Sequence, residues 1–149
     1  HSKEFSQLNG EFVFLRMDGV MLWNNFSEKK NIQELSALSA GLWQSACSLA
    51  NYSENHSMNK VLSFGTSSGG LLAQDIASGD KNYLLLMKYN NVLNPSKVKL
   101  KFRGLKQVIE DSLYLEGKKS LDNSNVNSVQ PFKDITDEEM DNLFSFSEV

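Results

Sequence analysis

The sequence has few of the residues from which metal sites, disulfides and catalytic centres are built. It contains one cysteine and two histidines among 149 residues. We expect Cys47 to be a buried thiol without a disulfide partner, which suits a protein of the reducing cytoplasm. His56 has no cysteine or second histidine nearby in the sequence, so no metal site is predicted. Because no nucleophile motif accompanies it, we expect no catalytic residues, no enzyme activity and no cofactor.

Long apolar runs and a strong excess of one charge are also missing. No run approaches the roughly 18 apolar residues that indicate a membrane-spanning helix, and no secretion signal is recognisable. The formal net charge of −3 argues against broad binding to nucleic acid. We therefore expect partners that are proteins, with no nucleic acid and no membrane insertion.

Five β-forming runs account for much of the sequence. The dipeptide Asp18-Gly19 separates the first two runs and is a strong hairpin signal. Residues 84–87 are apolar on both faces, which is typical of a central strand covered on both sides. The predicted strands are residues 11–16, 20–23, 60–65, 70–77 and 82–89.

The middle of the chain predicts one long helix. Residues 35–52 carry no charge, and Asn31 with Glu34 has the spacing of a capping box. At helical spacing, a leucine-rich stripe widened by Trp43, Cys47 and Ala50 is expected to pack on the sheet. This stripe consists of Leu35, Leu38, Leu42, Ala46 and Leu49.

The opposite side of this helix is small and uncharged, where a surface helix usually carries lysine and glutamate. Small residues permit another backbone to approach closely, and the simplest such neighbour is the same helix of a second copy. The alternative is a small polar face that meets water. The predicted dimer interface consists of Ala37, Gly41, Gln44, Ser45 and Ser48.

A second helix is expected to start at Asn94-Pro95 and to end near Leu115, before Gly117. Its apolar face is formed by Val98, Phe102, Leu105, Ile109 and Leu113. Its first half is basic, either as a solubilising face or as a landing site for an acidic partner. This predicted basic face consists of Lys97, Lys99, Lys101, Arg103 and Lys106.

The remaining segments divide the chain into four parts. Residues 1–10 are expected to be an N-terminal remnant or tag, 11–116 one domain, 117–130 a flexible linker, and 131–149 an acidic amphipathic tail. The tail is expected to dock on the basic face of its own domain, on the same face of the dimer mate, or on a partner protein. Its apolar residues are Ile135, Met140, Leu143, Phe144 and Phe146.

Four stretches resemble the Roadblock family, the dynein light chain Roadblock type, which includes MglB-like bacterial regulators of Ras-like GTPases. They are FVFLRMDGVMLW, ELSALSAGLWQSACSLA, KVLSFGTSSGGLLAQDIASGDKNYLLLMKYN and PSKVKLKFRGLKQVIEDSL. The resemblance implies an α+β fold with a five-stranded antiparallel sheet in β-β-α-β-β-β-α order and helices on both faces. It also implies a homodimer with paired middle helices and joined edge strands. The family's usual first helix is missing or reduced to residues 2–9.

Three functions are compatible with these features. The first is a non-catalytic homodimeric adaptor or regulator that binds a Ras-like small GTPase. The second is a scaffold subunit of a larger complex, acting in polarity, motility or signalling without contacting a GTPase. The third, a small-molecule sensor, ranks last because few polar groups converge on any evident pocket.

Overall fold

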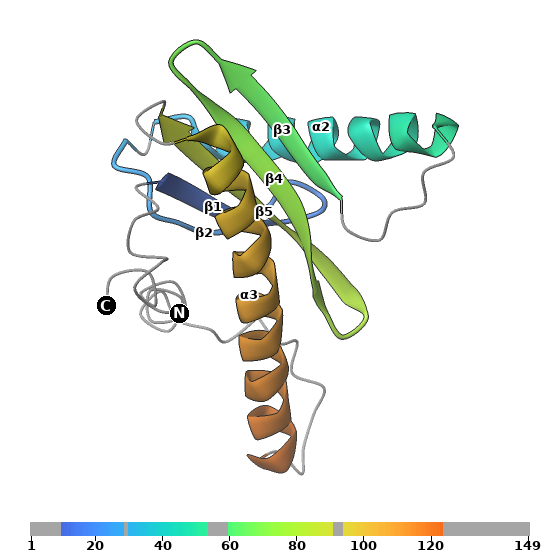
Figure 1. Cartoon of the computed structure of the whole chain (residues 1–149). Helices are drawn as coiled ribbons and strands as arrows, with labels where there is room; N and C mark the ends of the chain where they lie inside the picture. Colours follow the sequence, from blue (N-terminus) through green and yellow to red (C-terminus); the bar gives the residue numbers. More distant parts are fainter. Residues whose placement is uncertain (1–9, 29, 54–59, 91–93, 124–149) are drawn as a thin grey trace.

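The computed structural model describes residues 10–28, 30–53, 60–90 and 94–123. Within them, all neighbouring strands are antiparallel, in the order β2-β1-β5-β4-β3. Helices α2 and α3 cover opposite faces of this five-stranded sheet (Figure 1). The predicted α+β architecture and element order are confirmed. The elements are β1 (Gly10–Arg16), β2 (Met21–Asn24), α2 (Ile32–Tyr52), β3 (Val61–Thr66), β4 (Gly69–Ser78), β5 (Lys81–Asn90) and α3 (Pro95–Asn123).

The hairpin between β1 and β2 turns at the predicted Asp18-Gly19. Gly19 has a φ of 89°, a conformation that side chains other than glycine rarely adopt. Its amide donates to the carbonyl of Arg16 at 2.9 Å. A Cβ at Gly19 would lie 3.0 Å from the Cα of Ala37. The turn therefore packs closely against α2 and needs glycine for two reasons.

The core has two layers, one on each side of the sheet. Strand β5 contributes to both, because Leu84 and Leu86 face α2 while Leu85 and Met87 face α3, and all four are buried. On the second face, α3 contributes the predicted stripe. Val98, Phe102, Ile109 and Leu113 are buried, and Leu105 packs beside them.

The predicted orientation of α2 is right for Leu35, Trp43 and Cys47, which pack on the α2-side core, and wrong for the other leucines. The face that packs on the sheet consists of Ile32, Ser36, Ser39, Ala40 and Trp43. The other leucines expected there point outward, with Leu38, Leu42 and Leu49 exposed by 66%, 49% and 70%. The two buried serines satisfy their hydroxyls by donating to backbone carbonyls one helical turn back, at 2.9 and 2.6 Å. Small side chains therefore bring α2 close to the sheet, and the most apolar stripe is left outside.

Two predicted helix ends also differ. Asn31 has a φ of 67° and makes no side-chain capping bond, so the expected capping box is absent at this helix start. Helix α3 continues to Asn123 instead of ending before Gly117. A single internal glycine costs a helix only about 1 kcal/mol relative to alanine. Asn94 does cap α3, because its side chain accepts from the amide of Ser96 at 2.9 Å.

Candidate protein-interaction surface

The outward face of α2 is apolar and uncharged. Besides the leucines, Tyr52 is 89% exposed, and the helix carries no charged residue after Glu34. Ser45 and Ser48 donate their hydroxyls to their own helix at 2.9 and 3.0 Å, which lowers the polarity of the face. Exposed apolar surface of this kind marks interaction sites in soluble proteins.

The five residues predicted for a dimer interface are all exposed, but they have different surroundings. Gly41, Ser45 and Ser48 lie on the outward face, and nothing approaches within 4 Å of a Cβ built at Gly41. Gln44 donates from its side-chain amide to the carbonyl of Met17 at 2.9 Å. Ala37 packs beside the β1–β2 turn. The structure therefore places two of the five against their own chain and three on the open face.

Strand β3 forms one edge of the sheet. Its six residues, Val61–Thr66, include no charged residue and no proline, the usual protections of an exposed edge. Phe64 is 58% exposed on this strand. The edge is therefore suited to pairing with a further strand.

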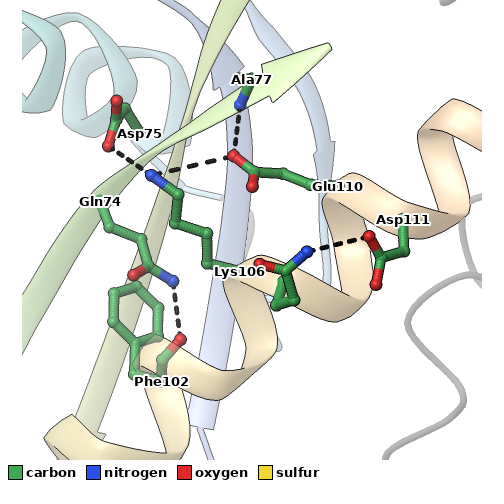
Figure 2. A network of polar contacts seen from close by, with 8 residues as sticks. Gln74, Asp75, Ala77, Phe102, Lys106, Glu110 and Asp111 are labelled. Atoms are coloured by element: carbon green, nitrogen blue, oxygen red, sulfur yellow. Dashed lines mark hydrogen bonds and ion pairs between the residues drawn. The ribbon is translucent and has the colours of Figure 1, made fainter. Parts of the chain in front are cut away.

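Strand β4 extends beyond β3, and α3 covers the part that β3 leaves unpaired. The register between the two strands begins with Val61 opposite Gln74. Past that point, the amide of Ala77 donates to the carboxylate of Glu110 at 2.8 Å (Figure 2). Lys106 bridges Asp75 at 3.0 Å and Glu110 at 3.8 Å. One half of this sheet edge is thus closed by side chains, while the half formed by β3 stays open.

This network separates the residues of the predicted basic face. Lys97, Lys99 and Arg103 are exposed and Lys101 is partly buried. The side chain of Lys106 is only 18% exposed and is held by the two carboxylates. The structure therefore does not gather all five cations on one free surface.

An open hollow of about 650 Å³ lies on the α2 face of the sheet, near the C-terminal end of β3. Phe64, Leu71, Lys88 and Glu11 form one row across four strands at its floor. Phe26 and Leu35 also line it.

The charges of this row are paired within the chain. Glu11 accepts from the hydroxyl and the amide of Ser27 at 2.7 and 3.1 Å and bridges Lys88 at 3.3 Å. The hydrogen bonds from Ser27 lower the pKa of Glu11 below its ordinary value, with a smaller contribution from Lys88. Lys88 also lies over the Phe26 ring at 5.7 Å. The hollow therefore offers mainly apolar surface.

The remaining predictions concern the tail, the single cysteine, metal ligands and membrane-spanning helices. Residues 131–149, the predicted tail, and His56 lie outside the described residues. Cys47 is a free thiol, partly rather than fully buried. In the described part of the chain, no group of three or more potential ligands is arranged to hold a metal ion. Neither described helix is long and apolar enough to cross a membrane.

Comparison with known structures identifies the fold. A structure titled "Myxococcus xanthus MglB" is 14% identical to this chain, covers 74% of it and 86% of its own length, and gives a TM-score of 0.57. A Roadblock/LC7 domain from Streptomyces avermitilis, also 14% identical, covers 69% and 83% with a TM-score of 0.55. The chain has a Roadblock/MglB-like fold. The predicted resemblance is confirmed at this level.

A further structure, titled "MglB with tetrameric arrangement", is 15% identical, covers 68% of this chain and 74% of its own length, and gives a TM-score of 0.54. No protein-family model matches the sequence, and no curated protein matches it at a significant level. Because identities near 15% establish the fold alone, the function of this Roadblock-like domain has to be argued from its surfaces.

Proposed function

We propose that this protein is a non-catalytic homodimeric adaptor that binds a Ras-like small GTPase and biases its nucleotide state. The observation that carries the proposal is the uncharged outward face of α2 beside the open edge of β3, on a Roadblock-like fold. Exposed apolar patches and unprotected sheet edges of this kind are typical of sites that a partner covers. A symmetric pair of copies covers both features with one interface.

The proposal of a GTPase partner rests on the likeness to MglB structures and on the resemblance of the sequence to regulators of this class. Its test starts from the full chain, bearing an affinity tag, in the organism from which it comes. We expect a small GTPase to co-purify, and the purified pair to bind with an affinity that differs between its GDP and GTP-analogue forms. Recovery of other proteins without any small GTPase would instead favour the scaffold function.

The proposal that this protein supplies no catalytic residue to a GTPase can be tested by replacing an arginine. The sequence has two, Arg16 and Arg103. Arg16 is ion-paired with Asp18, whereas Arg103 is exposed. We expect Arg103→Ala to leave any stimulation of GTP hydrolysis within about twofold, because losing an arginine finger costs on the order of a thousandfold or more. A loss of stimulation with unchanged binding would show that the arginine takes part in the chemistry.

A further inference from the structure

The side of α3 that is turned away from the sheet carries exposed apolar side chains. At helical spacing, they lie opposite the stripe that packs on the sheet. Leu113 is the last residue of α3 that the structure describes as buried, and the turns that follow it extend past the strands (Figure 1). This outward face of α3 consists of Leu100, Val108, Tyr114, Leu115 and Leu121.

The first half of α3 is basic around this face. Every charged side chain in residues 97–106 is basic. Lys106 is held by two carboxylates, as described above. Lys97, Lys99 and Arg103 are exposed and form no ion pair with any described residue. The first turn of α3 contains no acidic residue, although negative charge is favoured at the start of a helix. The three exposed cations and the helix dipole therefore both favour an acidic ligand here.

The tail, residues 131–149, has the complementary composition. Every charged side chain in residues 134–149 is acidic. The five apolar residues predicted for docking lie in the same segment, interleaved with the carboxylates. Such a segment matches a helix face that is apolar along its length and basic in its first half.

The connection between α3 and the tail is long enough for the tail to return along the helix. Residues 124–133 separate the end of α3 from the acidic segment. When extended, this connection spans up to roughly 33 Å. The helix rises about 30 Å from Arg103 to Asn123. The acidic segment can therefore reach the basic half of the same helix.

We propose that the tail docks on the outward face of α3 in its own chain. Its apolar side chains cover Val108 and Leu115, and its carboxylates lie beside the exposed cations of the first half. Because ordering the tail opposes the burial, the docking is reversible. An acidic partner that binds the same face must displace the tail. Docking within one chain requires neither the proposed homodimer nor a GTPase.

Hydrogen exchange of the full chain, followed by mass spectrometry, tests the docking. We expect the amides of residues 135–146 to exchange about tenfold or more slowly than in an unfolded chain. Lys99→Glu should accelerate this exchange about threefold, because it places a like charge beside the carboxylates. The matched control is Lys30→Glu, which makes the same charge change at an exposed lysine before α2. It should leave the exchange of the tail unchanged.

A charge swap tests whether the two segments meet. We expect Glu138→Lys alone to accelerate exchange of the tail about threefold, as Lys99→Glu does. The double variant should recover most of the protection, because opposite charges again face each other. Two accelerations that simply multiply in the double variant would show that Lys99 and Glu138 do not interact.

A cross-link identifies the chain whose α3 is covered. The full chain carries Cys47→Ser, which removes the only cysteine, together with Val108→Cys and Leu143→Cys, and is treated with a short bismaleimide. Under denaturing conditions we expect an internally linked species with the mass of one chain. In the control, Tyr52→Cys replaces Val108→Cys, because Tyr52 is 89% exposed at the end of α2.

Three results would overturn the docking on α3 of the same chain. They are exchange of the parent tail at the unfolded rate, protection that Lys99→Glu leaves unchanged, and an internal cross-link no stronger than in the Tyr52→Cys control. A linked species of twice the mass would place the tail on a second copy instead. Each of these results leaves the proposed function standing, since recovery of a small GTPase is measured separately.

Discussion

The side-chain amide of Gln74 donates a 2.7 Å hydrogen bond to the carbonyl oxygen of Phe102, and both residues are almost completely buried. This bond joins β4 to α3 inside an otherwise apolar layer. A buried polar side chain is tolerated in such a layer because its polar atoms are satisfied. Among the described residues, no buried side-chain nitrogen or oxygen lacks a partner.

We expect Gln74→Leu to lower the free energy of unfolding by about 1 kcal/mol, the usual net value of one hydrogen bond. Gln74→Ala should cost about 2 kcal/mol or more, since it also leaves a cavity. Urea denaturation of the two variants measures both. Equal losses would show that the hydrogen bond to Phe102, rather than packing volume, determines the stability at this position.

The closed half of the β4 edge gives a second prediction. Glu110→Ala removes the acceptor for the amide of Ala77, and we expect hydrogen exchange at that amide to accelerate by about tenfold. Glu110→Gln keeps an acceptor and should exchange nearly as slowly as the parent chain. If both variants exchange at the parental rate, the contact with Glu110 does not protect this edge.

Glu11 predicts how stability depends on pH. Its hydrogen bonds from Ser27 hold its pKa below the ordinary value of 4.5, so the folded protein favours the carboxylate more than the unfolded chain does. This stabilisation is complete above about pH 4.5 and is lost as the pH falls through the folded pKa. We expect Glu11→Gln to flatten the acid limb of a plot of Tm against pH.

The matched control for Glu11 is Glu116→Gln, which neutralises an exposed carboxylate on α3. It should keep the acid limb of the parent chain. The same flattening in both variants would assign the effect to net charge rather than to the bonds with Ser27.

The proposed dimer predicts a large effect at Gly41. A glutamate there would place a charge inside the interface, at a cost of several kcal/mol if it is buried without a partner. We expect Gly41→Glu to sediment as a folded monomer at micromolar concentration. Gly117→Glu is the control, because both glycines lie in helices and neither has an atom within 4 Å of a built Cβ. A normal dimer for Gly41→Glu would place the interface elsewhere.

The strands and their order along the chain could be predicted from the sequence because turn signals such as Asp18-Gly19 and Gly79-Asp80 separate the β-forming runs within each hairpin. The stripe of α3 was equally predictable, since its apolar residues face the sheet. On α2 the same reasoning was right for Trp43 and Cys47 and failed for most of the leucines. It assumes that the most apolar side of a helix faces its own core, whereas Leu38 and Leu49 face outward and Ser36 and Ser39 face inward.

The contacts between α3 and β4 gave no signal in the sequence. Glu110 and Ala77 lie far apart along the chain. Their hydrogen bond forms in the part of β4 beyond Gln74, where β3 no longer pairs with it. In the sequence, Lys106 is one of several lysines in a basic stretch. Its ion pairs with Asp75 and Glu110 are visible only in the tertiary structure. Side-chain pairing across elements depends on register, which periodicity within one element does not contain.

One face of α2 packs on the sheet and the other is exposed, and this separation affects how such a protein can change during evolution. Ser36, Ala40 and Trp43 are buried between the helix and its own sheet, while Leu38, Leu42 and Leu49 are exposed. In the proposed dimer, substitutions in the second group are therefore expected to alter association and to leave folding nearly untouched. A duplicated gene copy can acquire a new preference for partners by drift on that single stripe, without first passing through an unstable ancestor.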